Sequence, residues 1–347
     1  MDRGTFWLPP QLSTTAGDID ALFYFIYWAS VVFAIGVGVA TVYLAWKYRR
    51  THAAHRGERV KENAVLETTW IVIPTLLVLV VFFWGFKAYV DTVVAPADSY
   101  EINVQAKMWA WDFYYDDGTV MPNELHVPEG TPVKLIMNST DVLHSFFVPD
   151  FRIKHDVIPN RYSYVWFETI DGLAGDTVQI VCTEYCGTGH SNMGAKIIVH
   201  SVEDFWAGEW KGGYEPDDNP VEVGEALYTK QSCNTCHSLD GSRKVGPSFV
   251  GNWGQPRDGS SGSPVMNEDY VYQSIRNPNA HIVAGYPGVM PAYTEAQLSD
   301  LEIFALTAFI KSENGVTNIP PTLAESGLMD DVAADGTDAA ADSTSAQ

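Results

Sequence analysis

Five side chains with metal-binding chemistry lie near the middle of the 347-residue chain. Cys182, Cys186, His190 and Met193 occupy one glycine-punctuated stretch, and a further imidazole, His144, lies upstream. Thiolate and thioether sulfur together with imidazole suit copper, and two thiolates this close in sequence can bridge two metal ions and leave one histidine for each. A structural zinc site or a Cys182–Cys186 disulfide remains an alternative, but neither uses both histidines and the methionine.

The other two cysteines form a second motif, Cys233-Asn234-Thr235-Cys236-His237. This is the attachment motif of c-type heme, in which two thioethers hold the porphyrin and the adjacent imidazole binds iron. A zinc-binding or redox-active C-x-x-C is the alternative, although no second thiol pair remains for zinc and no βαβ pattern surrounds the motif. Met290 is the best-placed sixth ligand, ahead of Met266 and Met329. His/Met ligation raises the iron potential, as an electron relay requires.

Helical and β patterns predict how these motifs are positioned. After Met290, a helix is predicted to start at Thr294 with Gln297 as its capping-box partner, because apolar residues follow at helical spacing. Short β-branched or aromatic runs between turn residues indicate a β domain from Tyr89 to His200, built as an antiparallel sandwich or barrel. The strands are expected at these runs: 100–104, 133–136, 162–167, 176–181 and 196–199.

Two uncharged apolar runs, 21–46 and 68–86, are each long enough to cross a bilayer. Buried core helices and a cleavable signal peptide are the alternatives, and both fit the length and charge of the first run less well. Lys47, Arg49 and Arg50, then Arg56, Arg59 and Lys61, follow the first run, so this connection is expected on the cytoplasmic side and both termini outside.

The charge distribution separates the regions. The chain carries 21 basic and 43 acidic residues, a net charge of −22, yet residues 1–87 hold 8 basic and 6 acidic residues. The negative charge therefore belongs to the exported part, and nucleic acid is excluded as a partner because no basic face is available. The last segment, 313–347, has no basic residue and no hydrophobic periodicity, which predicts an acidic disordered tail.

The stretch from Cys182 to Met193, with His144, resembles the CuA site of subunit II of heme-copper cytochrome c oxidases, a binuclear copper centre on a cupredoxin fold. The resemblance runs from Leu8-Pro9-Pro10 through both apolar runs to about residue 200. It implies that Cys182 and Cys186 bridge the coppers. His144, His190, Met193 and the backbone carbonyl of Glu184 would complete the ligand shell.

The same resemblance implies roles for other residues. Trp109, in an aromatic stretch from Met108 to Tyr115, matches the electron entry port, although a packed aromatic strand would look the same. Glu67 matches a glutamate at the mouth of a proton channel. The helix dipole alone also favours an acidic residue at a helix N-terminus, so capping is the alternative explanation. The Glu184 carboxylate would help to hold magnesium at the catalytic subunit. Asn160 stands where the family usually has glycine, so a differently shaped turn is expected there, which Asn can tolerate in a left-handed conformation.

The region after 220 resembles a class I cytochrome c, in which the carbonyl of Pro247 would orient the His237 imidazole. The whole chain is therefore similar to subunit II of caa-type oxidases, with a cytochrome c fused to it. That resemblance implies a bacterial plasma-membrane protein with its redox domains on the periplasmic side. Its partners would be membrane lipid, subunit I with heme a and CuB, subunit III, and an external donor such as cytochrome c or another periplasmic redox protein.

We therefore expect a multidomain chain: a two-helix transmembrane hairpin, an all-β cupredoxin (Greek-key barrel) CuA domain and an all-α class I cytochrome c domain with one covalent heme c. The predicted boundaries are an outside segment (1–20), the hairpin (21–90), the CuA domain (91–205), a linker (206–220), the cytochrome domain (221–312) and the tail (313–347).

The expected function is electron transfer from heme c to CuA and on to subunit I, which reduces oxygen to water and pumps protons. Two alternatives come from other classes. A copper-handling or assembly protein would bind exchangeable, mononuclear copper and would need no covalent heme. A CuA subunit of a nitric oxide reductase-like complex would relay electrons to a different reaction.

Overall fold

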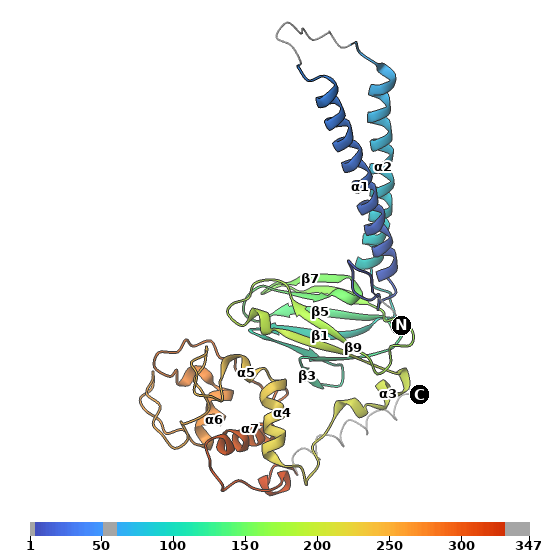
Figure 1. Ribbon diagram of the computed structural model, residues 1–347. Helices are drawn as coiled ribbons and strands as arrows, with labels where there is room; N and C mark the ends of the chain where they lie inside the picture. The colour runs from blue at the N-terminus through green and yellow to red at the C-terminus, as the bar shows by residue number, and fades with distance from the viewer. Residues whose placement is uncertain (1–3, 51–60, 330–347) are drawn as a thin grey trace.

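The computed structural model describes residues 4–50 and 61–329. It contains two long helices at one end, a β sandwich in the middle and a helical domain on the far side of the sandwich (Figure 1). The predicted basic connection with Arg56 and Arg59 and the last acidic residues, 330–347, lie outside the described residues. This layout agrees with the predicted multidomain fold class.

The helices α1 (Ala16–Lys47) and α2 (Ala64–Val93) run side by side (Figure 1). Both are long and apolar enough to cross a membrane, and no residue of their most apolar windows is buried within the chain. Their contact is made by ring pairs such as Phe25 and Trp84, whose centroids are 5.5 Å apart. Their apolar faces therefore require an apolar surrounding other than this chain, as membrane helices do.

A buried ion pair ties the base of α1 to the β sandwich. The Arg152 guanidinium donates to both carboxylate oxygens of Asp20, at 2.7 and 2.9 Å, and both side chains are less than one-tenth exposed. Arg152 has a φ of 60°, and its remaining donors bond the carbonyls of Pro9, Pro10 and Pro149. This bidentate arrangement fixes the orientation of the helix as well as its position.

Two five-stranded sheets form the sandwich. The first has the order β3-β2-β1-β5-β8 and the second the order β4-β10-β9-β6-β7. Their strands are β1 (Tyr100–Lys107), β2 (Ala110–Tyr114), β3 (Val120–Pro122), β4 (Glu124–Pro128), β5 (Val133–Ser139), β6 (His144–Val148), β7 (Ile153–Val157), β8 (Ser163–Phe167), β9 (Thr177–Cys182) and β10 (Gly194–His200). All five predicted runs are strands.

The prediction of a purely antiparallel sandwich was wrong, because β1 pairs with β5 and β4 with β10 in parallel. Large side chains such as Trp111, Phe113, Phe146 and Ile180 fill the space between the sheets and are fully buried. Asn160, in the loop before β8, has a φ of 58°, which is the left-handed conformation that Asn tolerates.

The helical domain is built on α4 (Pro220–Lys230), α5 (Cys233–Cys236), α6 (Glu268–Arg276) and α7 (Asp300–Glu313). Helices α4 and α7 cross closely at Gly224, where any Cβ would lie 2.1 Å from the carbonyl oxygen of Ala305. Shorter segments connect or flank the domains: α3 (Val202–Ala207), η1 (Pro149–Phe151), η2 (His190–Asn192), η3 (Glu209–Lys211), η4 (Pro278–Ala280) and η5 (Leu323–Ser326).

The predicted start of the last helix was wrong by six residues. Helix α7 begins at Asp300, and Ser299 and Glu302 form its capping box. Thr294 and Gln297 do make the predicted contact, since the Thr294 N–H donates to Gln297 Oε1 at 3.0 Å, but they form a turn before the helix. Both pairs match the capping pattern, and the second adds acidic charge to the first helical turn, which the helix dipole favours.

The expectation of disorder from residue 313 was wrong for the first part of the tail. Leu323 is fully buried against the helical domain, and its N–H donates to the carbonyl of Asp218 at 2.9 Å. Part of the predicted linker is ordered by packing as well, since Trp210 stacks on Phe205 and His126 of the sandwich. A few apolar residues among polar neighbours, such as Trp210 and Leu323, pack in each segment, a pattern that periodicity does not detect.

Candidate copper and heme sites

The two thiols of the first motif lie on a loop between paired strands. Cys182 ends β9, His190 opens η2 and Met193 immediately precedes β10. The Cys182 N–H donates to the Met193 carbonyl at 3.2 Å, so the hairpin pairing of β9 and β10 closes the loop at its ends. We call residues 182–193 the ligand loop.

Sulfur and nitrogen atoms converge within this loop. The Sγ atoms of Cys182 and Cys186 are 3.8 Å apart, which is too far for a disulfide bond of about 2.05 Å. Cys186 Sγ lies 3.5 Å from His190 Nδ1 and 3.7 Å from Met193 Sδ. The carbonyl oxygen of Glu184 is 3.3 Å from Cys182 Sγ. The structure thus brings all the sequence-predicted ligands of the loop together.

His144 reaches the same point from β6. One atom each of His144, Cys182 and Cys186 lies within 4.8 Å of the others. His144 is fully buried, and its Nδ1 has no hydrogen-bond partner among the described residues, while its Nε2 bonds Asp141 Oδ1 at 2.8 Å. A buried nitrogen without a partner is costly, so this one is explained by a metal ion that it would bind.

The ionisation of the two thiols also fits a cation between them. Burial alone raises the pKa of Cys182, but the adjacent His144 side chain and the backbone at Ser145 outweigh burial and bring the pKa down to about 6. Burial and the neighbouring negative charge of Cys182 raise the pKa of Cys186 to about 12. A second thiolate this close to the first therefore needs positive charge beside it.

Trp109 packs directly on the ligand loop. Together with Met108 it forms the two-residue tip between β1 and β2, which we call the hairpin tip. The Trp109 indole N–H donates to the Cys186 carbonyl at 3.0 Å. The ring covers Gly189 so closely that a Cβ there would lie 2.3 Å from Trp109 Cδ2. Trp109 therefore lies in a turn between two strands and packs on the ligand loop.

Asp141 joins the hairpin tip to the ligand set, a role that the sequence reasoning missed. Its Oδ1 accepts from His144 Nε2, and its Oδ2 accepts from the Met108 N–H at 2.6 Å. Burial raises the pKa of Asp141, and hydrogen bonds from His144 and two backbone amides lower it further than burial raises it. An acid three residues before a candidate ligand was the available signal, because metal-binding histidines are commonly oriented by carboxylates.

The second motif lines a crevice in the helical domain. Cys233, Cys236 and His237 lie on it, and their thiols are free. The His237 Nδ1–H donates to the Pro247 carbonyl at 2.7 Å, as predicted, which leaves Nε2 for another partner. A Cβ at Gly246 would lie 2.7 Å from His237 Cε1, so the glycine lets this loop approach the imidazole. Free thiols, an oriented imidazole and largely apolar walls together fit a covalent heme.

Two methionines of the helical domain line this crevice. Met290 and the more deeply buried Met266 both line it, whereas Met329 packs against the core of the domain. His281, which the sequence analysis did not single out, also lines the crevice, and its buried Nε2 has no partner among the described residues. No spacing pattern distinguished His281 from the other histidines.

The remaining predicted residues lie apart from these centres. Glu67 is exposed in the first turn of α2, after the N-cap Asn63, whose side chain accepts from the Leu66 N–H at 3.1 Å. Glu184 is partly exposed on the ligand loop. Its backbone carbonyl contacts Cys182 Sγ, and its side-chain carboxylate takes no part in that contact.

The crevice and the hairpin tip meet. Met108, Trp109 and Ala110 of the sandwich line the same cavity as the heme motif, and Cys236 and Val245 pack against the core of the sandwich. Trp109 therefore lies between the two candidate sites and touches both of them.

Three family models match consecutive parts of the chain. Residues 3–88 match the transmembrane domain of cytochrome c oxidase subunit II, residues 81–202 its periplasmic domain, and residues 219–310 subunit III of the cbb3-type oxidase. The cytochrome c oxidase subunit 2 of Alkalihalophilus pseudofirmus is 30% identical over 280 residues, which cover 77% of this chain and 78% of that protein. The chain belongs to the cytochrome c oxidase subunit II family.

Two further proteins are similar to parts of this chain. Cytochrome c oxidase subunit 2 of Bacillus subtilis is 27% identical over 306 residues, covering 81% of this chain and 84% of that protein. The solved periplasmic domain of subunit II from Bradyrhizobium japonicum is 25% identical and covers 34% of this chain and 94% of its own, with a TM-score of 0.31.

Membership of the family indicates the cofactors, the partner subunit and the membrane location in general terms. The subunit II model implies CuA copper in the sandwich, and the cytochrome model implies heme c in the helical domain. Subunit I is the implied partner in the oxidase complex. With two membrane-spanning helices, this subunit II is a membrane protein of the respiratory chain that carries its redox domains outside the membrane.

Proposed function

We propose that this subunit II accepts electrons from an external donor at heme c, passes them to a binuclear CuA centre and delivers them to subunit I for oxygen reduction coupled to proton pumping. When bound, a heme c and a copper pair each gain and lose one electron without further bond changes. The contact of Trp109 with both the crevice and Cys186 is the observation that carries the proposal.

The side chains around the ligand loop would hold the coppers. Cys182 and Cys186 would bridge the two ions, and His144 Nδ1, His190 Nδ1, Met193 Sδ and the Glu184 carbonyl would complete the shell. The partnerless His144 nitrogen and the 3.8 Å separation of the thiols support this assignment. Asp141 keeps the His144 ring in one orientation, and the walls of the buried site exclude water from the sulfur atoms.

In the helical domain, Cys233 and Cys236 would hold one porphyrin through thioethers. His237 and Met290 would bind the iron, with Met266 as the competing methionine on the same crevice. Pro247 fixes the His237 imidazole by accepting its Nδ1–H, and this makes the other nitrogen a better ligand. The proposed boundaries of this cytochrome domain remain 221–312, between the linker 206–220 and the tail.

Trp109 would serve as the relay between the two centres. Its ring is 6% exposed, lies over Gly187 and Gly189 and donates to the carbonyl of a proposed copper ligand. Tethering the cytochrome domain to the copper domain makes the heme-to-copper transfer intramolecular, so this step does not depend on the concentration of the external donor.

Further assignments belong to the same proposal. Glu67 would stand at a proton entry on the cytoplasmic side, and the Glu184 carboxylate would help to bind magnesium at subunit I. Subunit III and a periplasmic donor such as a cytochrome c would complete the complex in the bacterial plasma membrane, with both termini outside. The acidic exported domains favour a basic donor, whose reaction would slow as salt is added.

The test uses the full-length chain, loaded with heme and copper and kept in detergent. After rapid mixing with a reduced donor, we expect the heme c absorbance to change first, at a rate that depends on donor concentration. The near-infrared copper band should follow in a phase that does not. One copper per chain, or copper in rapid exchange with solution, would refute the proposal and favour a copper-handling protein.

A matched pair of tryptophan variants tests the relay. Trp109→Phe removes the indole N–H and its bond to Cys186, so the second phase should slow while the first is unchanged. Trp206→Phe, at an exposed tryptophan of α3, is the control and should change neither phase. Equal second phases in both variants would exclude Trp109 as the relay.

A further inference from the structure

A buried charge pair flanks the hairpin tip on the face that the helical domain covers. Lys107, at the end of β1, bonds Asp112 of β2 at 2.7 Å, and the two residues are 4% and 1% exposed. A buried ion pair at a surface between two domains is costly unless the covering domain supplies further partners. The structure shows which residues of the helical domain do so.

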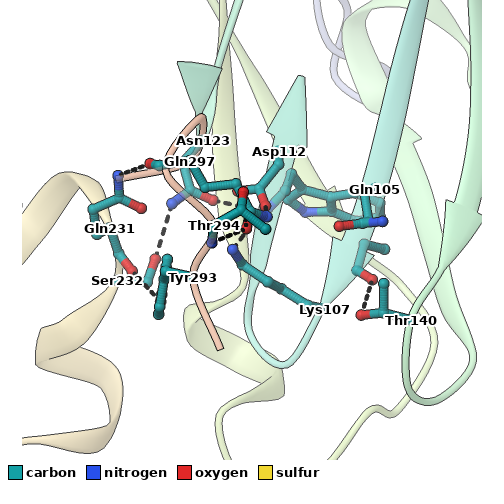
Figure 2. A network of polar contacts seen from close by, with 12 residues as sticks. Gln105, Lys107, Asp112, Asn123, Thr140, Gln231, Ser232, Tyr293, Thr294 and Gln297 are labelled. Atoms are coloured by element: carbon teal, nitrogen blue, oxygen red, sulfur yellow. Dashed lines mark hydrogen bonds and ion pairs between the residues drawn. The ribbon is translucent and has the colours of Figure 1, made fainter. Parts of the chain in front are cut away.

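Gln297 supplies the partner for Asp112. Its Nε2 donates to Asp112 Oδ2 at 2.8 Å and to the Tyr114 hydroxyl at 2.9 Å (Figure 2). Its Oε1 accepts from both the backbone N–H and the hydroxyl of Thr294, at 3.0 and 3.1 Å. Because Thr294 can donate only to the amide oxygen, the orientation of the amide is fixed, and its N–H groups must point at the sandwich.

The helical domain also supplies a partner for the Lys107 ammonium group, the aromatic ring of Tyr293. Its Nζ lies 4.4 Å from the centre of the Tyr293 ring, which comes from the segment before Gln297 (Figure 2). The Gln231 side chain in turn donates to the Gln297 carbonyl at 3.0 Å, and it is 3% exposed. Both charges of the hairpin are thus matched by uncharged groups of the helical domain, which suits an interface that excludes water.

A second contact lies on the other side of the hairpin. Asn123 has a φ of 58° and accepts the Trp111 N–H at 2.9 Å with its Oδ1. Its Nδ2 donates to the Lys230 carbonyl at 2.8 Å and to the Ser232 hydroxyl at 3.0 Å, immediately before the heme motif. The hairpin is therefore held at two points, one next to Cys233 and one at Gln297.

We infer that Asp112 and Gln297 are positioning residues that lock the helical domain on the hairpin tip, so that the heme crevice stays seated on Trp109. The lock is polar and directional, and it acts through the hairpin without touching either redox centre. Its part in electron transfer rests on the proposed function, whereas the docking itself does not. The face of the sandwich that carries Trp109 is then closed to soluble donors.

The test exchanges donor and acceptor across the interface. Gln297→Glu replaces the N–H donors with a second carboxylate beside Asp112, so like charges would face each other. Asp112→Asn with Gln297→Glu restores a donor opposite an acceptor and keeps one negative charge beside Lys107. Gln273→Glu makes the same change at an exposed position of α6 and is the matched control.

The geometry is read by pulsed electron paramagnetic resonance of the oxidised, full-length chain, as the distance distribution between the heme and copper spins. We expect a narrow distribution in the parent chain and in Gln273→Glu. Gln297→Glu should give a broad, longer distribution, because losing a hydrogen bond to a charged group lowers the ratio of docked to undocked molecules about tenfold or more. Internal transfer requires the docked arrangement and should slow by a similar factor. The double variant should recover both.

The outcomes separate this inference from the proposed function. Absence of the copper-pair or heme spectra in the parent chain would refute the proposed function. Intact spectra with an unchanged distance and rate in Gln297→Glu would overturn the lock, and so would a double variant no better than the single one. If Gln297→Glu fails to fold, Gln297→Met replaces it, since a side chain of similar length removes both N–H bonds to the sandwich without adding a charge. A parent-like distance in that variant would then overturn the lock.

Discussion

Gly189 is predicted to be the position where the smallest added group disturbs the proposed relay. An alanine Cβ at Gly189 would lie 2.3, 2.4 and 2.8 Å from Cδ2, Cε3 and Cγ of Trp109. Carbon atoms in contact are usually at least about 3.5 Å apart, so the indole or the loop must move by roughly 1 Å. The indole cannot retreat freely, because its N–H bonds Cys186 and its other side faces the crevice.

Gly189→Ala should therefore lower the free energy of unfolding of the copper domain by about 1–3 kcal/mol, the usual cost of overpacking a buried site. It should also slow transfer from heme to copper, since the indole leaves its place between them. The assays are denaturant unfolding followed by the copper band and the rapid-mixing experiment, both on the loaded full-length chain.

Gly213→Ala is the matched control for this variant. No atom lies within 4 Å of a Cβ at Gly213, so the same methyl group should change neither stability nor rate. If Gly189→Ala left both quantities as they are in Gly213→Ala, the tight contact between Trp109 and the ligand loop would be refuted.

Three further predictions follow from the contacts around the sandwich. Asp141→Asn, which removes the charge behind His144, should weaken copper binding roughly 10- to 100-fold in competition with a chelator, and an unchanged affinity would contradict the orienting role. Burial and then the neighbouring charge of His200 lower the pKa of His126 to about 3, so the folded state holds it neutral while the unfolded state takes up a proton below pH 6.5. Stability should be complete above pH 6.5 and should fall, by at most about 1.4 kcal/mol per pH unit, as the pH drops toward 3, and His126→Gln should flatten the pH 5–6.5 part of a denaturation series. Asp20→Ala leaves the Arg152 charge unpaired and should destabilise the junction of α1 and the sandwich by about 3–5 kcal/mol, measured by thermal unfolding against Asp18→Ala on the same helix.

The local motifs could be predicted because their chemistry is carried by neighbouring residues. The heme attachment sequence needs only Cys233, Cys236 and His237 in one turn, and the ligand loop needs only the closure of β9 onto β10. The two apolar runs are equally local, since length and lack of charge decide whether a helix can span a bilayer. Alternation along the chain gave the strands, but not the parallel pairing of β1 with β5, which depends on how distant segments meet.

Contacts between distant residues had no signal in the sequence. Thr294-x-x-Gln297 looks like a capping box, yet the Gln297 amide is drawn to Asp112, which lies 185 positions away, and the helix begins at the next capping pair. The burial of Leu323 could not be foreseen for a similar reason, since its pocket is formed by other segments of the chain.

The amino-acid sequence by itself determined the kinds of metal ligands, their order and the membrane anchor, because these are fixed by residue type and spacing. Only the tertiary structure decided that Asp141 orients His144, that Trp109 touches both centres, and that a polar lock holds the two domains together. Those relations depend on distances of about 3 Å between side chains from different elements, and such distances exist only once the chain has folded.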